Sequence, residues 1–310
     1  MISDNIILAR IRNSFTYRTK DLLHRVMKAT SPLWSHTLYL KIRYRSRFGR
    51  KLDLENPVTF NEKINWLKLH YTPDSYSKLV DKYEVKKIVA ELIGDEHIIP
   101  TIGVWDDPDE IDFDSLPEKF VLKCNHNSGK GMYICKDKRQ LNRNQVRRNL
   151  RKGLKEKHYM LSLEFQYKNV KPLILAEQYM EDEPGGELKD YKFFCFNGKV
   201  KFCKVDFDRF TEHHANYYDL DWNQLPFEEL FYPANFERII DCPPAFERMI
   251  EIAEKLADGI PFVRVDLYNV FGKIYFGELT FTPYGGMGQF VPDEWDYKIG
   301  ELLILPSPIV

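Results

Sequence analysis

The sequence of 310 residues lacks any apolar stretch of about 18 residues, the length at which a membrane-spanning helix is normally suspected. Its five cysteines form no Cys-x-x-Cys pair, so reduced thiols in the cytosol are the plain interpretation. The amino-terminal segment carries charges among its apolar residues and does not resemble a signal peptide. There are no internal repeats and no low-complexity segments. These absences favour a cytoplasmic protein that does not cross a membrane.

What the sequence contains is sufficient for a sizeable core. Apolar residues make up 44% and aromatic residues 14%, which favours two or more lobes at this length. The net charge of −1 hides an asymmetry, because residues 1–51 hold 12 basic and 2 acidic residues and the remainder holds 33 and 44. In this basic arm, Ile7, Ile11 and Phe15 recur at helical spacing. The arm suits an anionic membrane surface, RNA, or a helical cap packed on the main body. No RNA-binding signature accompanies the charge, so we expect no nucleic-acid partner.

Hairpins dominate the strand pattern, and helices are mixed among them. Asn197-Gly198, a typical two-residue hairpin turn, joins two apolar runs, and Gly272 lies between two more. Apolar spacing predicts one helix from Pro57 to Leu69, entered through Thr59, and another from Tyr76 to Ile93. Strands in hairpins mixed with helices favour an α+β fold over a doubly wound parallel sheet.

A glycine loop follows one strand-like run. The run Phe120–Lys123 ends in a lysine and leads to Ser128-Gly129-Lys130-Gly131. A Walker A loop would need a glycine five residues before its Gly-Lys pair and Ser or Thr after the lysine, but position 124 is Cys and position 131 is Gly. The glycines would still let backbone N–H groups approach phosphate oxygens closely.

The last predicted hairpin carries two acidic residues. Asp266 follows Arg264-Val, and Glu278 lies in Gly277-Glu-Leu-Thr280, 12 positions farther on. A connecting loop of odd length would turn both carboxylates to the same face of the sheet. Neither belongs in an apolar hairpin without a partner, and Mg²⁺ is a natural one. Ordinary ion pairs, for instance with Arg264, are the alternative interpretation.

Three lysines supply the opposite charge, namely Lys123, Lys130 and Lys192. Lys192 is flanked by aromatic residues and must face either an anion or solvent. Together with the glycine loop and the acidic pair, these lysines favour a triphosphate over unrelated surface charges. The segment from Leu175 to Met180 offers an apolar slot and exposed backbone groups, as an adenine needs.

In this order, the motifs resemble those of the ATP-grasp superfamily. The amino-acid sequences of four segments are similar to those of its TupA-like branch, namely 190–193, 205–210, 218–223 and 277–281. That branch is named for a teichuronopeptide biosynthesis protein and is associated with bacterial surface polysaccharides. The resemblance covers about residues 54–292, and its motifs are specific in combination.

The resemblance implies an ATP-grasp fold in which two α+β lobes clasp the nucleotide, with ATP and Mg²⁺ as cofactors. It implies four regions: a basic helical arm (1–55), a pre-ATP-grasp region (56–118), a small lid lobe (119–182) and a large lobe with the metal site (183–310). The ATP-binding residues that it implies are Lys123, Ser128, Gly129, Lys130, Gly131, Glu177, Gln178, Tyr179, Met180, Lys192, and Asp182 or Glu183 for the ribose. The implied metal ligands are Asp266, Glu278 and Thr280, the last at a position where many relatives have Asn, and the implied catalytic residues are Arg264, Lys192 and Lys130.

The activity that the resemblance implies is carboxylate activation. Transfer of the γ-phosphoryl group makes an acyl phosphate, which an amine attacks to form an amide. The expected function is a carboxylate–amine ligase that joins an amine or amino acid to a uronic acid, in capsule, O-antigen or teichuronopeptide synthesis. If the saccharide is lipid-linked, the basic arm would hold the enzyme at the inner membrane face.

Other interpretations stay open at this point. Asp219-Leu-Asp221 has the Asp-x-Asp form that holds a metal and a sugar nucleotide in glycosyltransferases, although a hydrated acidic turn explains it equally well. His213-His214 beside Glu212 suggests zinc, but no further ligand has suitable spacing. A phosphotransferase would release ADP without an amine acceptor, and a scaffold protein would not respond to nucleotide.

Overall fold

The computed structural model describes residues 35–181, 188–209 and 211–309. The chain divides into two compact units, Met1–Pro57 and Val58–Val310. The described part of the first unit contains helix α2 (His36–Phe48), which ends at Gly49 with φ +75°. At its start, the Ser35 hydroxyl accepts a hydrogen bond from Leu38 N at 3.2 Å. Most of the predicted amphipathic arm, including Ile7, Ile11 and Phe15, lies outside the described residues.

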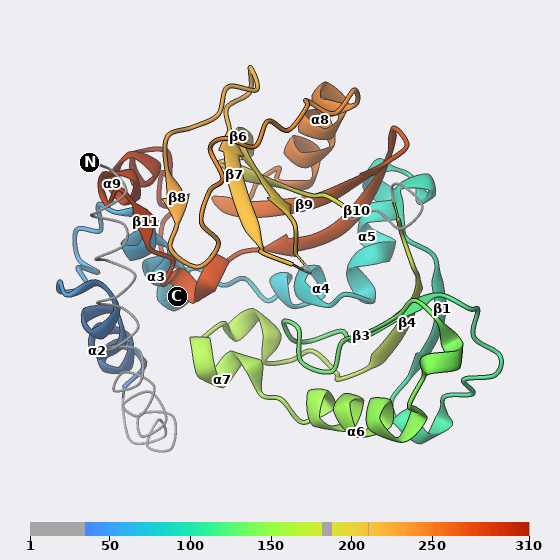
Figure 1. The fold of residues 1–310 in the computed structure, drawn as a ribbon. Coiled ribbons are helices and arrows are strands. Elements are labelled where there is room, and N and C mark those ends of the chain that lie inside the picture. Colours follow the sequence, from blue (N-terminus) through green and yellow to red (C-terminus); the bar gives the residue numbers. More distant parts are fainter. Residues whose placement is uncertain (1–34, 182–187, 210, 310) are drawn as a thin grey trace. The chain divides into compact units, whose positions relative to one another are not determined.

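Two large antiparallel sheets organise the second unit (Figure 1). The four-stranded sheet has the order β1 (Thr101–Trp105), β4 (Ile174–Gln178), β2 (Phe120–Cys124) and β3 (Tyr133–Cys135). The five-stranded sheet has the order β10 (Lys273–Thr280), β9 (Phe262–Val270), β5 (Asp190–Phe196), β6 (Lys199–Phe207) and β7 (His214–Tyr218). A two-stranded sheet pairs β11 (Phe290–Val291) with β8 (Glu228–Glu229).

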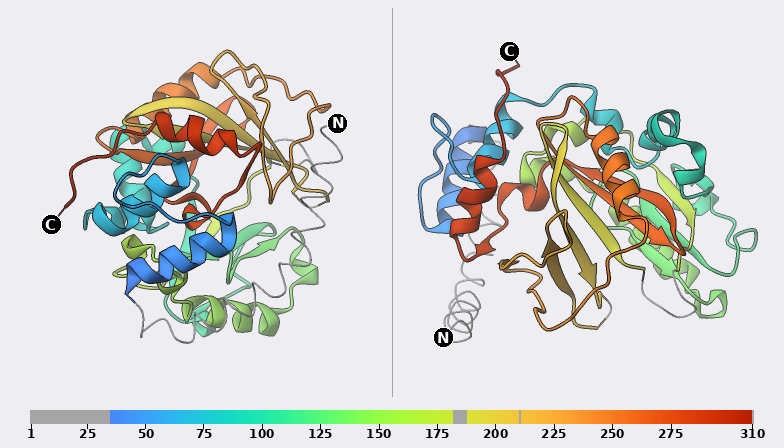
Figure 2. Two further views of the ribbon diagram at one scale, coloured as in Figure 1. Left: turned by 90° about the vertical axis from the view of Figure 1, so that its left-hand side faces the viewer. Right: turned by 90° about the horizontal axis from the view of Figure 1, so that it is seen from above.

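Helices cover the outer faces of the two large sheets. In Figures 1 and 2, α8 lies on the side of the five-stranded sheet away from the four-stranded sheet, and α6 lies on the far side of the four-stranded sheet. Within the described ranges, no helix is both long and apolar enough to span a bilayer. The helices of this unit are α3 (Phe60–His70), α4 (Tyr76–Val80), α5 (Glu84–Ile93), α6 (Arg143–Leu154), α7 (His158–Ser162), α8 (Phe246–Leu256) and α9 (Glu294–Glu301). Short 3₁₀ helices are η2 (Asp95–His97), η3 (Pro108–Glu110), η4 (Lys138–Gln140), η5 (Phe165–Tyr167) and η6 (Pro283–Gly286).

Helix α3 begins with a capping box, as the position of Thr59 predicts. The Thr59 hydroxyl accepts a hydrogen bond from Glu62 N at 3.3 Å, and the Glu62 carboxylate accepts one from Thr59 N at 3.0 Å. Both residues are buried, so water cannot replace either partner readily. The cap therefore fixes the point at which α3 enters the core.

We expect Thr59→Ala to lower the free energy of unfolding by about 1 kcal/mol, because Glu62 N loses its acceptor. Urea denaturation of the whole chain measures this change. Thr59→Ser keeps the hydroxyl and should recover most of the loss. An equal loss in both variants would show that the hydrogen bond is not the cause.

The predicted helix from Tyr76 to Ile93 is wrong as a single element. It divides into α4 and α5, because the Asp81 carboxylate accepts hydrogen bonds from Tyr83 N at 2.9 Å and from the Asn125 side chain at 2.9 Å. The contact with Asn125 is a tertiary one that apolar spacing does not reveal. The break places Lys82 beside the glycine loop.

The five-stranded sheet has two different faces because successive side chains of a strand alternate. On β5, Phe193 and Cys195 join an apolar core with α5 and α8. Phe194 and Phe196 point to the opposite face and pack in a second core with α3 and α9. Lys192 shares that second face, farther along the strand. This face is therefore apolar at one end and charged at the other.

A β-bulge at Gly277 sets the direction of the acidic residue in β10. Phe276 is paired with Leu267 and Glu278 with Asp266, so Gly277 is an extra residue in the ladder. The loop between β9 and β10 has two residues, rather than the odd number on which the expectation of a shared face depended. The bulge supplies the missing residue and turns Glu278 to the face of Asp266. A Cβ atom at Gly277 would lie 2.9 Å from Asp266 O, so a larger residue would disturb this pairing.

Candidate active site

A cavity of about 400 Å³ is lined by residues of both large sheets. The four-stranded sheet contributes Val121, Lys123 and Ile134, and the five-stranded sheet contributes Tyr268 and Phe276. Alternation explains the first set, because Phe120 and Leu122 face the core under α6 while their neighbours face the cavity. The volume is in the range of small-molecule sites.

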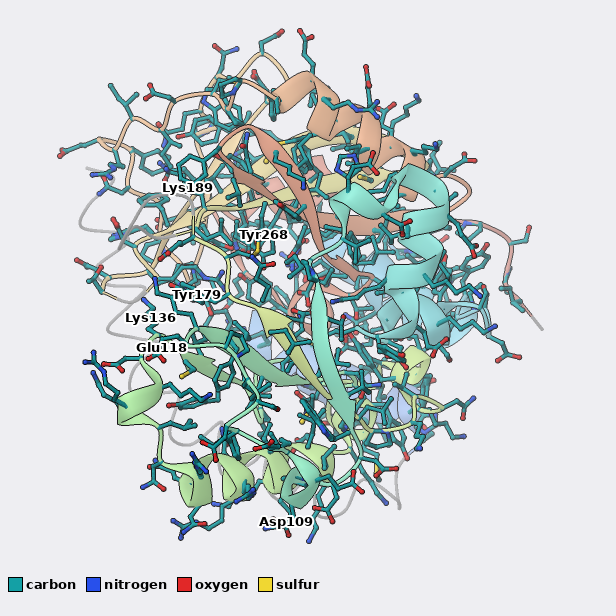
Figure 3. The ribbon with its side chains drawn as sticks, turned by 90° about the vertical axis from the view of Figure 1, so that its right-hand side faces the viewer. Asp109, Glu118, Lys136, Tyr179, Lys189 and Tyr268 are labelled. Atoms are coloured by element: carbon teal, nitrogen blue, oxygen red, sulfur yellow. The ribbon has the colours of Figure 1, made fainter. Side chains whose placement is uncertain are left out.

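The end of the segment from Leu175 to Met180, which is predicted to hold an adenine and which we call the hinge, forms one wall of this cavity. Glu177, Gln178, Tyr179 and Met180 all line it, and Figure 3 labels Tyr179 together with Tyr268 on the other sheet. Val121, Ile134, Met180 and Phe276 give this part of the lining an apolar surface. A flat heteroaromatic ring fits such a slot.

Next to the hinge, a buried carboxylate holds two lysines. Glu177 lies 2.5 Å from Lys123 Nζ and 2.7 Å from Lys86 Nζ. Burial alone would raise the pKa of Glu177, but Lys123 and Lys86 outweigh it and lower the pKa. Lys86 also donates to Ile99 O at 2.8 Å, which holds its ammonium group in place. The group carries a net positive charge at one side of the cavity.

The two glycines of the loop have different surroundings, because Gly131 is packed against α6 and Gly129 has open space around it. Gly131 has φ +75°, and a Cβ there would lie 2.8 Å from Cys124 Sγ and 3.1 Å from Gly153 Cα in α6. Gly129 has φ +81° with no atom within 4 Å of an added Cβ. The predicted catalytic Lys130 is 61% exposed and pairs with Glu156 at 2.7 Å. Met132, just beyond the loop, lines the cavity, but Ser128, Gly129, Lys130 and Gly131 are not among its lining residues.

Lys192 lies in a buried cluster of carboxylates rather than on the cavity wall. Its ammonium group contacts Asp190 and lies 3.1 Å from Asp206 and 3.2 Å from Asp266. Burial would lower the pKa of Lys192, but the three carboxylates outweigh it and raise the pKa well above its usual range. Lys192 is therefore a permanent cation that gathers Asp190, Asp206 and Asp266 on one face of the sheet.

The three predicted metal ligands converge on a single cationic atom. Arg264 Nη2 lies 2.6 Å from Asp266 Oδ2, 3.1 Å from the Thr280 hydroxyl oxygen and 3.5 Å from Glu278 Oε1. The bulge and the strand register bring these oxygens together. Two carboxylates and a hydroxyl around a positive group are a donor set that suits Mg²⁺. The residues present therefore fit a divalent cation.

Lys82 was not selected from the sequence, although it connects the start of the glycine loop, the predicted metal ligand Glu278 and the cavity. It lines the cavity, donates to Asn127 O at 3.0 Å, and lies 3.5 Å from Glu278 Oε2. Burial would raise the pKa of Glu278, but Lys82, followed by Arg264, lowers it to about 2. The only sequence signal was an Asp-Lys pair inside an apparently continuous helix.

Two residues of the segment 206–214 also reach the cavity. Arg209 and His213 line the cavity, and they contact Asp190 and Asp206 at 3.2 Å each. Asp190 is buried, and no donor in the described part of the chain reaches its Oδ1 atom. The predicted ribose contacts, Asp182 and Glu183, lie outside the described residues.

The motifs behind the alternative functions have structural roles. The Asp219 carboxylate accepts hydrogen bonds from Asp221 N at 3.0 Å and Asn223 N at 2.7 Å, which closes an exposed turn. His213 contacts Asp206, whereas His214 stacks on Phe207 with ring centroids 5.8 Å apart. Over residues 35–309, apart from the undescribed positions, no group of three or more His, Cys, Asp or Glu side chains forms a metal site.

Comparison with known proteins gives one family match. The model of the TupA-like ATP-grasp family matches residues 62–304. No curated protein matches the chain at a significant level.

Several solved structures are similar to the chain. One is D-alanine–D-alanine ligase from Bacillus anthracis complexed with ATP, at 17% identity and TM-score 0.36, covering 66% of this chain and 53% of that one. Another is D-alanine–D-alanine ligase from Helicobacter pylori, at 13% identity and TM-score 0.41, covering 79% and 69%. A third is the ATP-grasp ligase PsnB complexed with a minimal precursor, Mg and ADP, at 12% identity and TM-score 0.37, covering 82% and 64%. The chain spans about half the length of the first of these proteins.

Proposed function

The chain belongs to the TupA-like ATP-grasp family, and we propose that it joins an amine or amino acid to the carboxylate of a uronic acid, at the cost of ATP. The match confirms the predicted family and, with it, the predicted ATP-grasp fold. The class of ATP-dependent carboxylate–amine ligase is part of the proposal, and the family supports it. The uronic acid, and its place in capsule, O-antigen or teichuronopeptide synthesis, are the finer part of the proposal. They follow from the resemblance to the TupA-like branch.

The lining of the cavity supports ATP as the bound nucleotide. Its apolar slot beside Met180 suits adenine. Lys82 and Lys123 supply positive charge for phosphate oxygens. At an effective dielectric of about 20, a unit-charge contact at about 4 Å is worth roughly 4 kcal/mol. Two such lysines can therefore offset much of the repulsion between ATP and a carboxylate substrate.

The observation that carries the proposal is the arrangement around Arg264. Asp266, Glu278 and Thr280 surround one of its nitrogens, and Lys82 connects Glu278 to the cavity. A phosphoryl group held beside Lys82 would thus lie near the side chain of Arg264 as well. It would also lie near the oxygen atoms of Asp266, Glu278 and Thr280, the predicted metal ligands. Positioning and charge neutralisation are the main contributions that a protein makes to phosphoryl transfer.

Each residue of this site has a separate role in the proposed reaction. Asp266, Glu278 and Thr280 would hold Mg²⁺, which neutralises phosphate charge when bound. Arg264 stabilises the negative charge that develops on the transferred group. Lys82 and Lys123 orient the phosphates. A carboxylate oxygen of the substrate then takes the γ-phosphoryl group as the bond to ADP breaks. The amine nitrogen attacks the carbonyl carbon, so that a C–N bond forms as the C–O bond to phosphate breaks, and the nitrogen loses a proton as inorganic phosphate leaves.

Nucleotide binding is the first test of this function. Mg²⁺-ATP at a hundredfold excess over Kd should stabilise the chain by about 2.7 kcal/mol in thermal or chemical unfolding. UDP-glucose and UDP-glucuronic acid should not, which distinguishes a ligase from a glycosyltransferase. Lys123→Met should remove most of the effect, whereas Lys199→Met, at a residue that is 67% exposed, should retain it. Equal stabilisation by the sugar nucleotides, or none by ATP, would contradict the proposal.

The reaction itself is tested by a screen of uronic acids against amines and amino acids for ADP release. We expect ADP only when an acid and an amine are both present. ADP released with the acid alone would favour a phosphotransferase. Contact of residues 1–51 with an anionic membrane is part of the same proposal, and it predicts salt-sensitive sedimentation with anionic vesicles.

A further inference from the structure

We propose that a row of four aromatic rings beside the cavity binds the sugar ring of the carboxylate substrate. The row consists of His213, Tyr232, Tyr284 and Phe231, which we call the aromatic row. This inference rests on the proposed function and deepens it, because it assigns the saccharide a place and a mode of recognition. A sugar-binding row would also distinguish a ligase that acts on sugar acids from a ligase that acts on amino acids or peptides.

Each ring of the aromatic row contacts the next one. His213 stacks on Tyr232 with centroids 3.9 Å apart, and Tyr232 lies 6.4 Å from Tyr284. Tyr284 in turn stacks on Phe231 at 5.7 Å, with only 12° between the ring planes. These side chains come from three segments that are distant in sequence. The row is thus a product of the tertiary fold.

A buried ion pair holds the two tyrosines of the row in position. Lys204 is 1% exposed, and its ammonium group lies 5.3 Å from the centroid of Tyr232 and 5.4 Å from that of Tyr284. Lys204 Nζ lies 2.6 Å from the Glu229 carboxylate, and the Tyr284 hydroxyl donates to the same carboxylate at 2.6 Å. The rings are therefore fixed before any ligand arrives, which reduces the entropy lost on binding.

The backbone of Tyr284 is unusual in a way that serves this placement. It has φ +52°, in the left-handed region that a residue with a Cβ seldom occupies. Such a conformation persists only where the surroundings enforce it, and it is commonly found at binding sites. Here the contacts of the side chain with Lys204 and Glu229 hold the ring in the row.

The exposed part of the row suits a sugar better than a wholly apolar group. Phe231 is 46% exposed, and His213, Tyr232 and Tyr284 are partly exposed. The face of an aromatic ring is electron-rich, and it attracts the C–H groups on the apolar face of a pyranose. The edge of a pyranose carries hydroxyls, which need polar partners. Arg209 and His213 stand beside Tyr232 on the cavity wall and supply them.

The position of the row brings the sugar to the reacting end of the cavity. His213 and Tyr232 line the cavity together with Lys123 and Gly277. Asp206 lies 3.2 Å from His213 and 3.1 Å from Lys192, and Lys192 lies 3.2 Å from Asp266. A pyranose on the row can therefore direct a carboxylate toward Arg209 and the phosphoryl site. A uronic acid has that combination of an apolar face and a single carboxylate.

The test measures ligand binding in the full chain by saturation-transfer difference NMR, with ADP and Mg²⁺ present or absent. The probes are glucuronate, galacturonate, glucose and cyclohexanecarboxylate, at millimolar concentrations. We expect the ring protons of the uronates to be saturated most strongly, with weaker signals from the other two probes. Phe231→Ala and Tyr232→Ala should weaken uronate binding by roughly three- to tenfold each. Phe231→Ala should keep the affinity of the wild type for ADP, because Phe231 is not among the residues that line the cavity.

Phe236→Ala is the matched control, because Phe236 is 48% exposed on the same segment as Phe231. A loss of uronate affinity in this control as large as in Phe231→Ala would overturn the proposal. So would the absence of uronate binding in a protein that binds ADP, a result that leaves the ligase function intact. Conversely, uronate binding without nucleotide binding would support the aromatic row and contradict the ligase. Stronger binding of cyclohexanecarboxylate than of the uronates would identify the row as an apolar site and would also overturn the proposal.

Discussion

Lys192→Met is expected to lower the free energy of unfolding by about 3–5 kcal/mol, because it leaves three carboxylates buried without their shared cation. Asp190, Asp206 and Asp266 are each less than 5% exposed, and Lys192 contacts all of them. Arg264 continues to neutralise Asp266, but Asp190 and Asp206 lose a central partner. Methionine has a similar length, so the change isolates the charge from the volume.

Urea denaturation, with the fluorescence of the buried aromatic core as its signal, measures the loss. Lys199→Met is the control, since Lys199 is 67% exposed and its ion pair with Glu254 should contribute less than about 1 kcal/mol. If Lys192→Met were as stable as this control, the cluster would owe its stability to other contacts. A loss that disappears when Asp190 is also changed to Asn would confirm the role of unpaired charge.

Glu278→Gln is expected to lower Mg²⁺-dependent turnover of ATP by about a hundred- to a thousandfold, and to lower the free energy of unfolding by less than Lys192→Met does. The side chain is 40% exposed, so the amide remains solvated, whereas the donor set loses one of its two carboxylates. The measurements are ADP release by a uronic acid and amine pair found in the screen, and the unfolding free energy. Glu294→Gln, in an exposed pair with Lys298, is the control for a lost surface charge.

Two results would contradict a metal-binding role for Glu278. One is unchanged turnover in Glu278→Gln, and the other is a loss of turnover that does not depend on the Mg²⁺ concentration. A loss of stability as large as that of Lys192→Met would point instead to a structural role. High Mg²⁺ concentrations should recover part of the activity, because the remaining ligands still bind the ion weakly.

The pKa of Glu278 defines the pH range over which its carboxylate is ionised. Its pKa in the folded chain is about 2, because Lys82 and Arg264 outweigh the effect of burial, and its unfolded value is about 4.3. A lowered carboxylate pKa stabilises the fold above the unfolded value, and this contribution is lost as the pH falls toward the folded value. Glu278 therefore remains ionised throughout the physiological range. Any loss of activity between pH 5 and 7 must come from another group.

The residues that sequence analysis identified share one property, which is that each belongs to a short contiguous motif. Lys123 ends a strand-like run, Glu177 to Met180 follow another, and Asp266 and Glu278 flank an obvious hairpin turn. Their place in the fold follows from alternation and from hairpin pairing, both of which are local rules. The family resemblance then supplied their order.

The residues that were missed come from segments without such a motif. Lys82 is directed by a contact of Asp81 with Asn125, 44 residues away. Tyr284 depends on Lys204 and Glu229, which are remote in sequence. The role of Lys192 was predicted from its charge, but the three carboxylates around it come from three strands. Tertiary neighbours of this kind cannot be derived from spacing.

The bulge at Gly277 leaves a trace in the sequence that can be used elsewhere. Ile274 and Phe276 enter the core at intervals of two, but the next core residue is Leu279, three positions on. That change of phase marks the place where the strand exchanges its inner and outer sides, so that an acidic residue lands in the polar half of the sheet. In chains whose folds are still unknown, a strand whose core residues change from a spacing of two to a spacing of three at a glycine would be a candidate for a cation-binding carboxylate.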